Sequence, residues 1–243
     1  MVTSPYFEVD FLRGKIKRMH IKANLRSVLS FAVFLGFGVL GTGAAHAQRL
    51  AVASGGEKLL TLNNNVNKNQ FIWESDAPLE SIRGSSEGVT GTFTIDPQDL
   101  STLRGTITTQ VATMKTGNDT RDNHLHSSEW LDASHFPLIS FTIISIGDVK
   151  TSGNTATGMA TGNFTMHGVT KRVSIPFKMT YLVENASTRQ RAPGDLVMIS
   201  ADFNISLKDF NIAGTEGVVG SKVGEQIKIT AQLFGNALPK STT

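Results

Sequence analysis

The chain has 243 residues, 23 lysines and arginines against 20 aspartates and glutamates, and no cysteine. The absence of cysteine excludes disulfide bonds, thiolate metal ligands and a cysteine nucleophile. The length is ample for one domain with a sizeable buried core.

The first 47 residues have the pattern of an export signal. An apolar run over residues 28–45 follows a charged segment and ends at Ala45-His46-Ala47, small residues at the positions that signal peptidase reads. We therefore expect residues 1–47 to be a signal peptide and the mature, exported chain to begin at Gln48. The charged segment contains Lys15, Lys17, Arg18, Lys22 and Arg26.

Two alternatives concern this same segment. The apolar run approaches the roughly 17–20 residues that span a bilayer, so a retained membrane anchor is the alternative to cleavage. Met19 is an alternative start to Met1, because it would shorten an unusually long charged segment. After cleavage we expect no stable membrane span.

Removing residues 1–47 changes the charge of the chain. The remainder holds 17 lysines and arginines against 18 aspartates and glutamates, a net charge of −1. Nucleic-acid binding domains carry a basic patch in the folded part. We therefore expect no nucleic-acid partner.

Residues 48–66 are rich in asparagine and glycine, and we expect a flexible tether there. A barrel domain is predicted over residues 67–236, followed by a tail over residues 237–243, because apolar and polar residues alternate with period two almost to the end. Pro176 predicts an edge or a bulge in its strand. Strands are expected at residues 71–73, 89–95, 107–113, 139–143, 157–166, 173–181, 197–207 and 227–233.

These segments predict an all-β fold of about eight antiparallel strands, which is the number that closes into a barrel. The alternation is interrupted between Thr120 and Phe141, where one short helix is expected near residues 122–133, ended by Pro137. This interruption holds three of the six histidines of the chain. It is therefore the first place to look for chemistry.

A metal site is one hypothesis for these histidines. Imidazole and carboxylate groups at His124, His126 and His135, or at His167 elsewhere, are ligands that zinc or copper accept. Residues two apart in a helix point to nearly opposite sides, which argues against a shared metal at His124 and His126. We expect no metal site.

Catalysis is a second hypothesis. Ser127 and Ser128 lie near histidines, but no G-x-S-x-G nucleophile elbow accompanies them. Asp122 and Glu129 could form a carboxylate pair, but nothing in the sequence places them across a cleft. We therefore expect no catalytic residue and no enzymatic activity.

Two motifs carry a family resemblance. The chain resembles the YceI-like family of exported proteins from about Asn67 to Phe234. The resemblance implies a lipocalin-like barrel in the bacterial periplasm, and members of the family include binders of polyisoprenoid chains in an elongated apolar cavity. The motifs read Thr116-Gly117, Thr120-Arg121-Asp122 with His124-Leu125, Trp130-Leu131-Asp132-Ala133 and Phe136-Pro137-x-Ile139-x-Phe141, then Gly162-x-Phe164-Thr165-Met166-His167-Gly168-Val169-Thr170-Lys171.

The leading hypothesis is a periplasmic binding or carrier protein that holds an isoprenoid-type or other amphiphilic lipid. Arg121 and His124 are the candidates for a polar head group, although Arg121 and Asp122 could instead form a pair at the helix start. No cofactor other than such a lipid is expected, and a homodimer is possible. The predicted apolar lining is Phe93, Phe141, Phe164, Phe177, Phe203 and Trp130. The alternatives are a filled barrel that serves as a structural or interaction module, and a histidine-based metal or haem protein.

Overall fold

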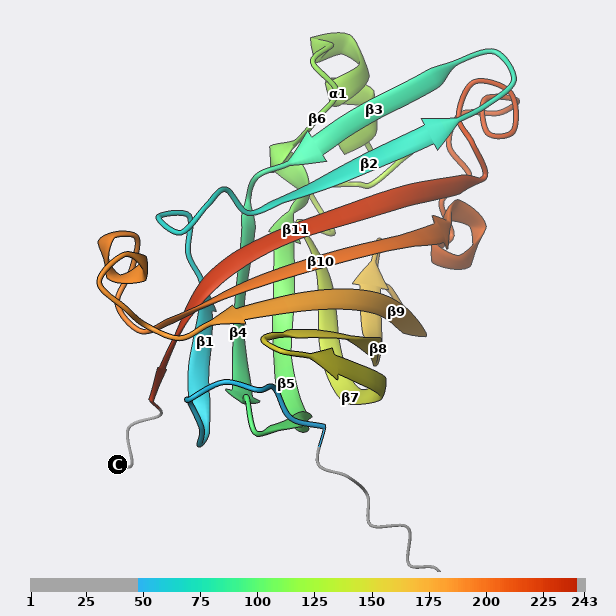
Figure 1. Ribbon diagram of the computed structural model, residues 1–243. Helices are drawn as coiled ribbons and strands as arrows, with labels where there is room; N and C mark the ends of the chain where they lie inside the picture. The colour runs from blue at the N-terminus through green and yellow to red at the C-terminus, as the bar shows by residue number, and fades with distance from the viewer. Residues whose placement is uncertain (1–47, 240–243) are drawn as a thin grey trace, which may run out of the picture. The chain divides into compact units, whose positions relative to one another are not determined.

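The computed structural model describes residues 48–239, so the predicted signal peptide lies outside the described residues. Eleven strands form one antiparallel sheet, shown in Figure 1. The strands are β1 (Lys58–Leu62), β2 (Gln70–Asp76), β3 (Ser81–Ser86), β4 (Val89–Asp96), β5 (Asp99–Gln110), β6 (Met114–Lys115), β7 (Leu138–Ser152), β8 (Thr155–Met166), β9 (Val169–Leu182), β10 (Asp195–Ser206) and β11 (Gln226–Pro239). The helices are α1 (Asp119–His126) and the 3₁₀ turns η1 (Val111–Thr113), η2 (Thr188–Gln190) and η3 (Leu207–Phe210).

Eight of the strands close into a barrel in the order β1, β4, β5, β7, β8, β9, β10 and β11, and β11 returns to pair with β1. The length of β11 lets it serve two neighbours. Its first half pairs with β2, as in Ile229 opposite Trp73, and its second half pairs with β1, as in Ala237 opposite Leu60. The β2–β3 hairpin and β6 therefore extend the wall at one end of the barrel (Figure 1). The predicted all-β barrel of about eight strands is confirmed.

The expected boundaries of the barrel were wrong at both ends. Residues 58–62 form β1 rather than a tether, and Leu60 is fully buried. β11 continues to Pro239, with Ala237 fully buried, so residues 237–239 belong to the barrel. The asparagine-rich segment after β1 is a hydrogen-bonded loop, in which the side chain of Asn69 accepts from the Phe234 N–H at 2.7 Å.

The helix is shorter than expected. α1 ends at His126, and residues 127–135 form turns instead of continuing it. Its start is fixed by Asn118, whose side chain accepts from the Arg121 N–H at 3.1 Å, as N-cap residues do. The helix cannot extend to residue 133, because Asp132 adopts a left-handed backbone conformation with φ of 46°.

Pro176 lies where two strands separate, which confirms the expectation of an edge. β9 pairs with β10 only over residues 177–182, so Pro176 has no partner strand on that side. The turn η3 packs at this end of β9 and β10, and its Phe210 ring meets Phe164 edge to face at 5.5 Å between centroids. His167 contributes a contact of 3.1 Å between its Nδ1 and the Phe210 carbonyl oxygen.

The end of the barrel away from the β2–β3 hairpin is filled by side chains. Leu60, Ile95, Met179 and Tyr181 are almost completely buried there. The segment before β1 crosses this end, where the Leu50 N–H donates to the Pro97 carbonyl at 2.9 Å and the Leu50 side chain is 1% exposed. This half of the interior is therefore an ordinary close-packed core.

A buried carboxylate ties this filled end together. Asp195 Oδ2 accepts from Tyr181 Oη and Ser54 Oγ, both at 2.6 Å, and lies 3.0 Å from Lys58 Nζ, while Oδ1 accepts from the Glu184 N–H at 2.8 Å. Burial raises the pKa of Asp195, but these hydrogen bonds favour the ionised form and lower the pKa overall. Burial and the same carboxylate raise the pKa of Tyr181.

Within residues 48–239, no helix combines the length and the apolar character needed to cross a membrane.

Candidate functional site

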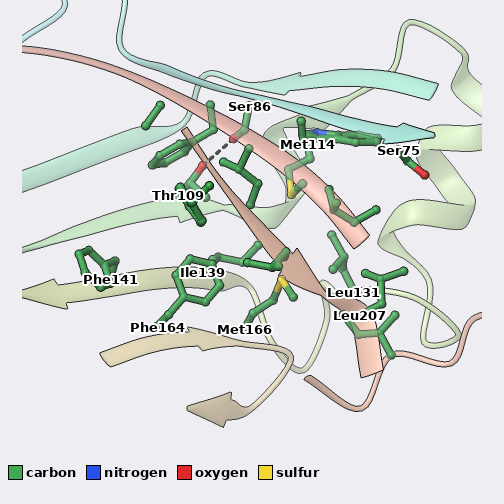
Figure 2. Close-up of a pocket in the computed structure, with 18 of the residues that line it drawn as sticks. Ser75, Ser86, Thr109, Met114, Leu131, Ile139, Phe141, Phe164, Met166 and Leu207 are labelled. Carbon is green, nitrogen blue, oxygen red and sulfur yellow. Dashed lines mark hydrogen bonds between the residues drawn. The ribbon is translucent and has the colours of Figure 1, made fainter. Parts of the chain in front are cut away.

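The half of the barrel near the β2–β3 hairpin is hollow. It encloses a cavity of about 520 Å³, within the roughly 300–1,000 Å³ that is usual for small-molecule sites. The walls come from β2 to β11, with α1 at one end. Figure 2 shows apolar side chains such as Ile139, Phe141 and Leu207 converging on this space. The alternative of a barrel filled throughout is therefore wrong.

The structure brings all of the predicted lining residues to this cavity. Phe141 and Phe164 are directly paired on β7 and β8, and the Phe164 ring meets Phe203 edge to face at 6.1 Å. Their contact with a ligand remains a prediction. The predicted residues that line the cavity are Phe93, Phe141, Phe164, Phe177, Phe203 and Trp130.

The prediction from the sequence left out most of the aliphatic residues of the cavity wall, although the period-two alternation of the strands places them on the inner face. On β9, for example, Ile175 shares the inward face with Phe177, two residues away. The same argument applies to other strands. The missed apolar residues include Trp73, Ile82, Leu103, Ile107, Met114, Ile139, Ile143, Met166, Ile199, Ile205, Ile227 and Ile229.

The cavity reaches the surface at the end of the barrel near the β2–β3 turn. Three residues both line it and are exposed to solvent, namely His124, Thr215 and Lys222. They belong to segments that we call the mouth: the β2–β3 turn at residues 77–80, α1 with the turns up to residue 135, and the loop at residues 213–225. The mouth is also where the polar side chains gather.

The segments of the mouth touch one another through polar contacts. Arg121 Nη2 lies 2.5 Å from Glu80 Oε1, Thr215 Oγ1 donates to Glu129 Oε2 at 2.9 Å, and the Leu79 N–H donates to the Ser221 carbonyl at 3.0 Å. Trp130 also packs on the loop at residues 213–225, where a Cβ placed on Gly214 would lie 2.6 Å from the indole ring. Together these contacts hold the three segments around the opening.

Both predicted head-group residues, Arg121 and His124, lie at the mouth. Arg121 is engaged by Glu80, so its charge is already balanced. Lys222 also lines the cavity and was missed; within residues 48–239 it has no ion-pair partner. It lies in a glycine-rich loop, where no periodicity indicates which residues face inward.

Deeper in the cavity the wall carries a short chain of hydroxyl groups. Ser86 Oγ lies 2.5 Å from Thr109 Oγ1 (Figure 2) and 2.8 Å from Thr113 Oγ1. Thr113 Oγ1 donates to the Gln110 carbonyl at 2.7 Å and accepts from the Gly88 N–H at 3.1 Å. Because the Thr113 proton is already used, Ser86 must donate to Thr113, and Thr109 must donate to Ser86.

The histidines proposed as metal ligands are dispersed. His126 Nε2 lies 2.9 Å from the Met114 carbonyl oxygen, and His135 Nδ1 lies 2.9 Å from Asp132 Oδ2. The Ser134 hydroxyl and the His135 ring lower the pKa of Asp132. In the part of the chain that the structure describes, no three histidine, cysteine or acidic side chains come together as metal ligands would.

The residues considered for catalysis do not converge either. Ser127 Oγ donates to the His124 carbonyl at 2.7 Å, and Glu129 is engaged by Thr215. Asp122 is buried under the helix start and accepts from the N–H and the hydroxyl of Thr116 at 2.7 and 2.6 Å. Each of these side chains is therefore engaged in holding α1, or the turns that follow it, in place.

Comparison with known proteins identifies related sequences. A family model described as a YceI-like domain matches residues 62–234. The proteins named YceI from Salmonella arizonae and Salmonella newport are each 32% identical over 142 residues, which cover 58% of this chain and 69% of the relative.

Solved structures with the same fold are also found. Burkholderia cenocepacia BcnA has a TM-score of 0.57 at 19% identity and covers 71% of this chain and 98% of its own. A domain from Saccharophagus degradans, described as polyisoprenoid binding and implicated in plant cell wall breakdown, has a TM-score of 0.51 at 11% identity and covers 78% and 100%. At these identities the likeness shows a shared fold.

Proposed function

The chain belongs to the YceI-like domain family, and on this premise we propose that it is a binding or carrier protein for an amphiphilic lipid, held without chemical change. The observation that carries the proposal is the cavity of about 520 Å³ with an apolar wall and a polar mouth. Each methylene transferred from water to such a wall gains about 0.8 kcal/mol. An apolar chain is therefore the ligand that this interior favours.

The polarity of the site sets the orientation of the ligand. The apolar chain of the lipid would extend from the mouth toward Phe93 and Phe177, while its head group would stay beside His124, Arg121 and Lys222. Burying a polar head group without hydrogen-bonding partners would cost free energy, so it remains at the opening. An isoprenoid chain is the first candidate, supported by the description of the Saccharophagus degradans domain.

Extraction and mass spectrometry of the full-length protein from its native cell would identify a co-purified lipid. A prenyl or fatty-acyl fluorescent probe tests uptake directly. We expect Ala160→Phe to abolish probe uptake, because Ala160 is buried in the cavity wall and a ring there would occupy the space of the ligand. Thr157→Phe, on the exposed face of the same strand, is the matched control and should leave uptake unchanged.

Two results would count against the proposal. The first is a protein that carries no lipid and takes up no probe. The second is equal uptake by the Ala160→Phe and Thr157→Phe variants, which would place the probe outside the barrel.

Export to the periplasm is part of the proposal. It rests on the charged segment, the apolar run and the Ala45-His46-Ala47 sequence. Mass spectrometry of the intact mature protein should give a chain beginning at Gln48, and Ala45→Arg should block that processing. A mature chain that retains residues 28–45 would instead support the membrane anchor.

A further inference from the structure

The cavity wall contains one buried polar group that has nothing to bind. Trp73 lines the cavity and is 8% exposed, and its indole Nε1 has no hydrogen-bond partner. Among the cavity-lining residues that the structure describes, no other buried side-chain nitrogen or oxygen atom lacks a partner. A buried donor without an acceptor is unfavourable, and native proteins rarely leave one unmatched.

The position of the indole is built into the sheet. Trp73 on β2 faces Gly84 on β3, and a Cβ at residue 84 would lie 2.1 Å from the Trp73 ring. The ring therefore occupies the space that any side chain at position 84 would need. The indole ring with the unpartnered N–H is therefore held against Gly84 of the neighbouring strand.

Neither the protein nor water provides a ready acceptor. The nearby hydroxyl chain runs from Thr109 through Ser86 to Thr113, and its contacts are internal. A buried water needs two to four polar partners, and the surroundings of Trp73 on this wall are mainly apolar. Because Trp73 lines the cavity, a ligand held there can supply the acceptor.

The depth of Trp73 distinguishes this acceptor from the head group. The Trp73–Gly84 pair lies three residues below the Asp76–Ser81 pair that opens the hairpin, which is about 10 Å at roughly 3.4 Å per residue. A head group beside Lys222 would sit at the mouth, above this level. A second polar atom of the ligand is needed to reach the indole.

We propose that Trp73 donates a hydrogen bond to a carbonyl oxygen in the buried part of the ligand, so that the cavity selects long-chain lipids with an internal carbonyl group over plain hydrocarbon chains. This inference rests on the proposed lipid-binding function and narrows its ligand class. An ester, an amide, a ketone or a quinone supplies such an oxygen. Trp73 is then the residue that determines specificity inside an otherwise apolar site.

The test uses two probes of equal chain length, tridecane and 7-tridecanone, whose carbonyl group is internal, and full-length protein labelled with ¹⁵N in its two tryptophans. The Trp130→Phe variant assigns the indole signals. We expect 7-tridecanone to move the Trp73 indole proton downfield, as hydrogen bonding does, and tridecane to leave it near its free position. Trp73→Phe should weaken 7-tridecanone binding about 3- to 10-fold, the usual range for one hydrogen bond, and change tridecane binding less than about twofold.

The outcomes separate the two proposals. Equal shifts of the Trp73 signal with both probes, or equal loss of affinity for both in Trp73→Phe, would overturn the role of the indole and leave lipid binding intact. Absence of binding by either probe would overturn the lipid-binding function and this inference together. The spectral test uses native Trp73, so it stands even where the Trp73→Phe variant folds poorly.

Discussion

The guanidinium of Arg121 and the carboxylate of Glu80 meet at 2.5 Å, and this contact joins α1 to the β2–β3 turn across the mouth of the cavity. The side chains are 36% and 37% exposed, so water and salt screen their attraction. Ion pairs of this kind contribute only about 0–1 kcal/mol. The contact therefore joins the two segments of the mouth only weakly, as the proposed entry and release of a ligand would require.

Breaking this ion pair should speed ligand release and leave the fold intact. We expect Arg121→Ala or Glu80→Ala to raise the dissociation rate of a fluorescent lipid about two- to fivefold, equivalent to at most about 1 kcal/mol. Stopped-flow dilution measures the rate. The control is Arg83→Ala, which removes the ion pair with Glu74 instead. If Glu80→Ala and Arg83→Ala release the probe at the same rate, the mouth contact does not restrain the ligand.

The packing of the Trp73 ring against Gly84 can be tested by adding a side chain at position 84. Gly84→Ala should destabilise the protein by about 1–3 kcal/mol, because the new methyl group overlaps the indole ring and backbone of β6. Gly147→Ala is the control: a Cβ there meets nothing within 4 Å, and a change within about 0.5 kcal/mol is expected. Urea unfolding measures both. Equal stability of the two variants would mean that the indole is not held against Gly84.

Phe177 and Met179 lie two residues apart on β9, and they test the division of the interior into a hollow and a filled half. Met179→Ala opens a hole in close-packed core and should cost about 2–5 kcal/mol. Phe177→Ala enlarges an existing cavity, so its cost should fall below the roughly 3–5 kcal/mol usual for this change. Chemical denaturation with and without lipid gives both values. A full-sized loss for Phe177→Ala without lipid would argue for a filled interior.

The buried carboxylate at the filled end should make stability depend on acid. The pKa of Asp195 is lowered below its ordinary value of 3.8, so the folded state favours the ionised form. That stabilisation is complete above the unfolded-state pKa and is lost as the pH falls through the folded-state pKa. Asp195→Asn should cost about 1–3 kcal/mol at pH 7. The difference from the native protein should shrink below about pH 4.

Urea unfolding of both proteins between pH 7 and pH 3 checks this prediction. Subtracting one curve from the other removes the contribution of other carboxylates, including Asp122. Burial raises the pKa of Asp122, but its hydrogen bonds from Thr116 lower that pKa overall. A difference that stays constant over the whole range would show that Asp195 is not the group that titrates.

The alternation of residues was sufficient to predict the barrel, because a strand with one buried face repeats its pattern every two residues. Phe93, Phe141 and Phe164 could be placed on the inner face for this reason. β1 could not be predicted in the same way. It is only five residues long, and its burial depends on closure by β11, which is far away in the sequence.

The mouth was predicted less well than the wall. The helical interruption of the strand pattern was enough to name Arg121 and His124 as candidates for the polar end of the site. Lys222 and Glu80 reach the same place from a glycine-rich loop and a hairpin turn, whose conformations are set by tertiary contacts rather than by any repeat. The unmatched indole of Trp73 could not be foreseen, because an aromatic residue in an alternating strand predicts only burial.

The segment before β1 covers the filled end of the barrel, where Leu50 is inserted among the core side chains. Because this end is filled, a lipid bound as proposed would leave by the mouth through which it entered, and the last part to enter would be the first to leave. Loading and delivery must then use the same opening in turn, and a donor and an acceptor cannot be engaged there together. Under the proposed function, the protein would therefore exchange its lipid with one partner at a time.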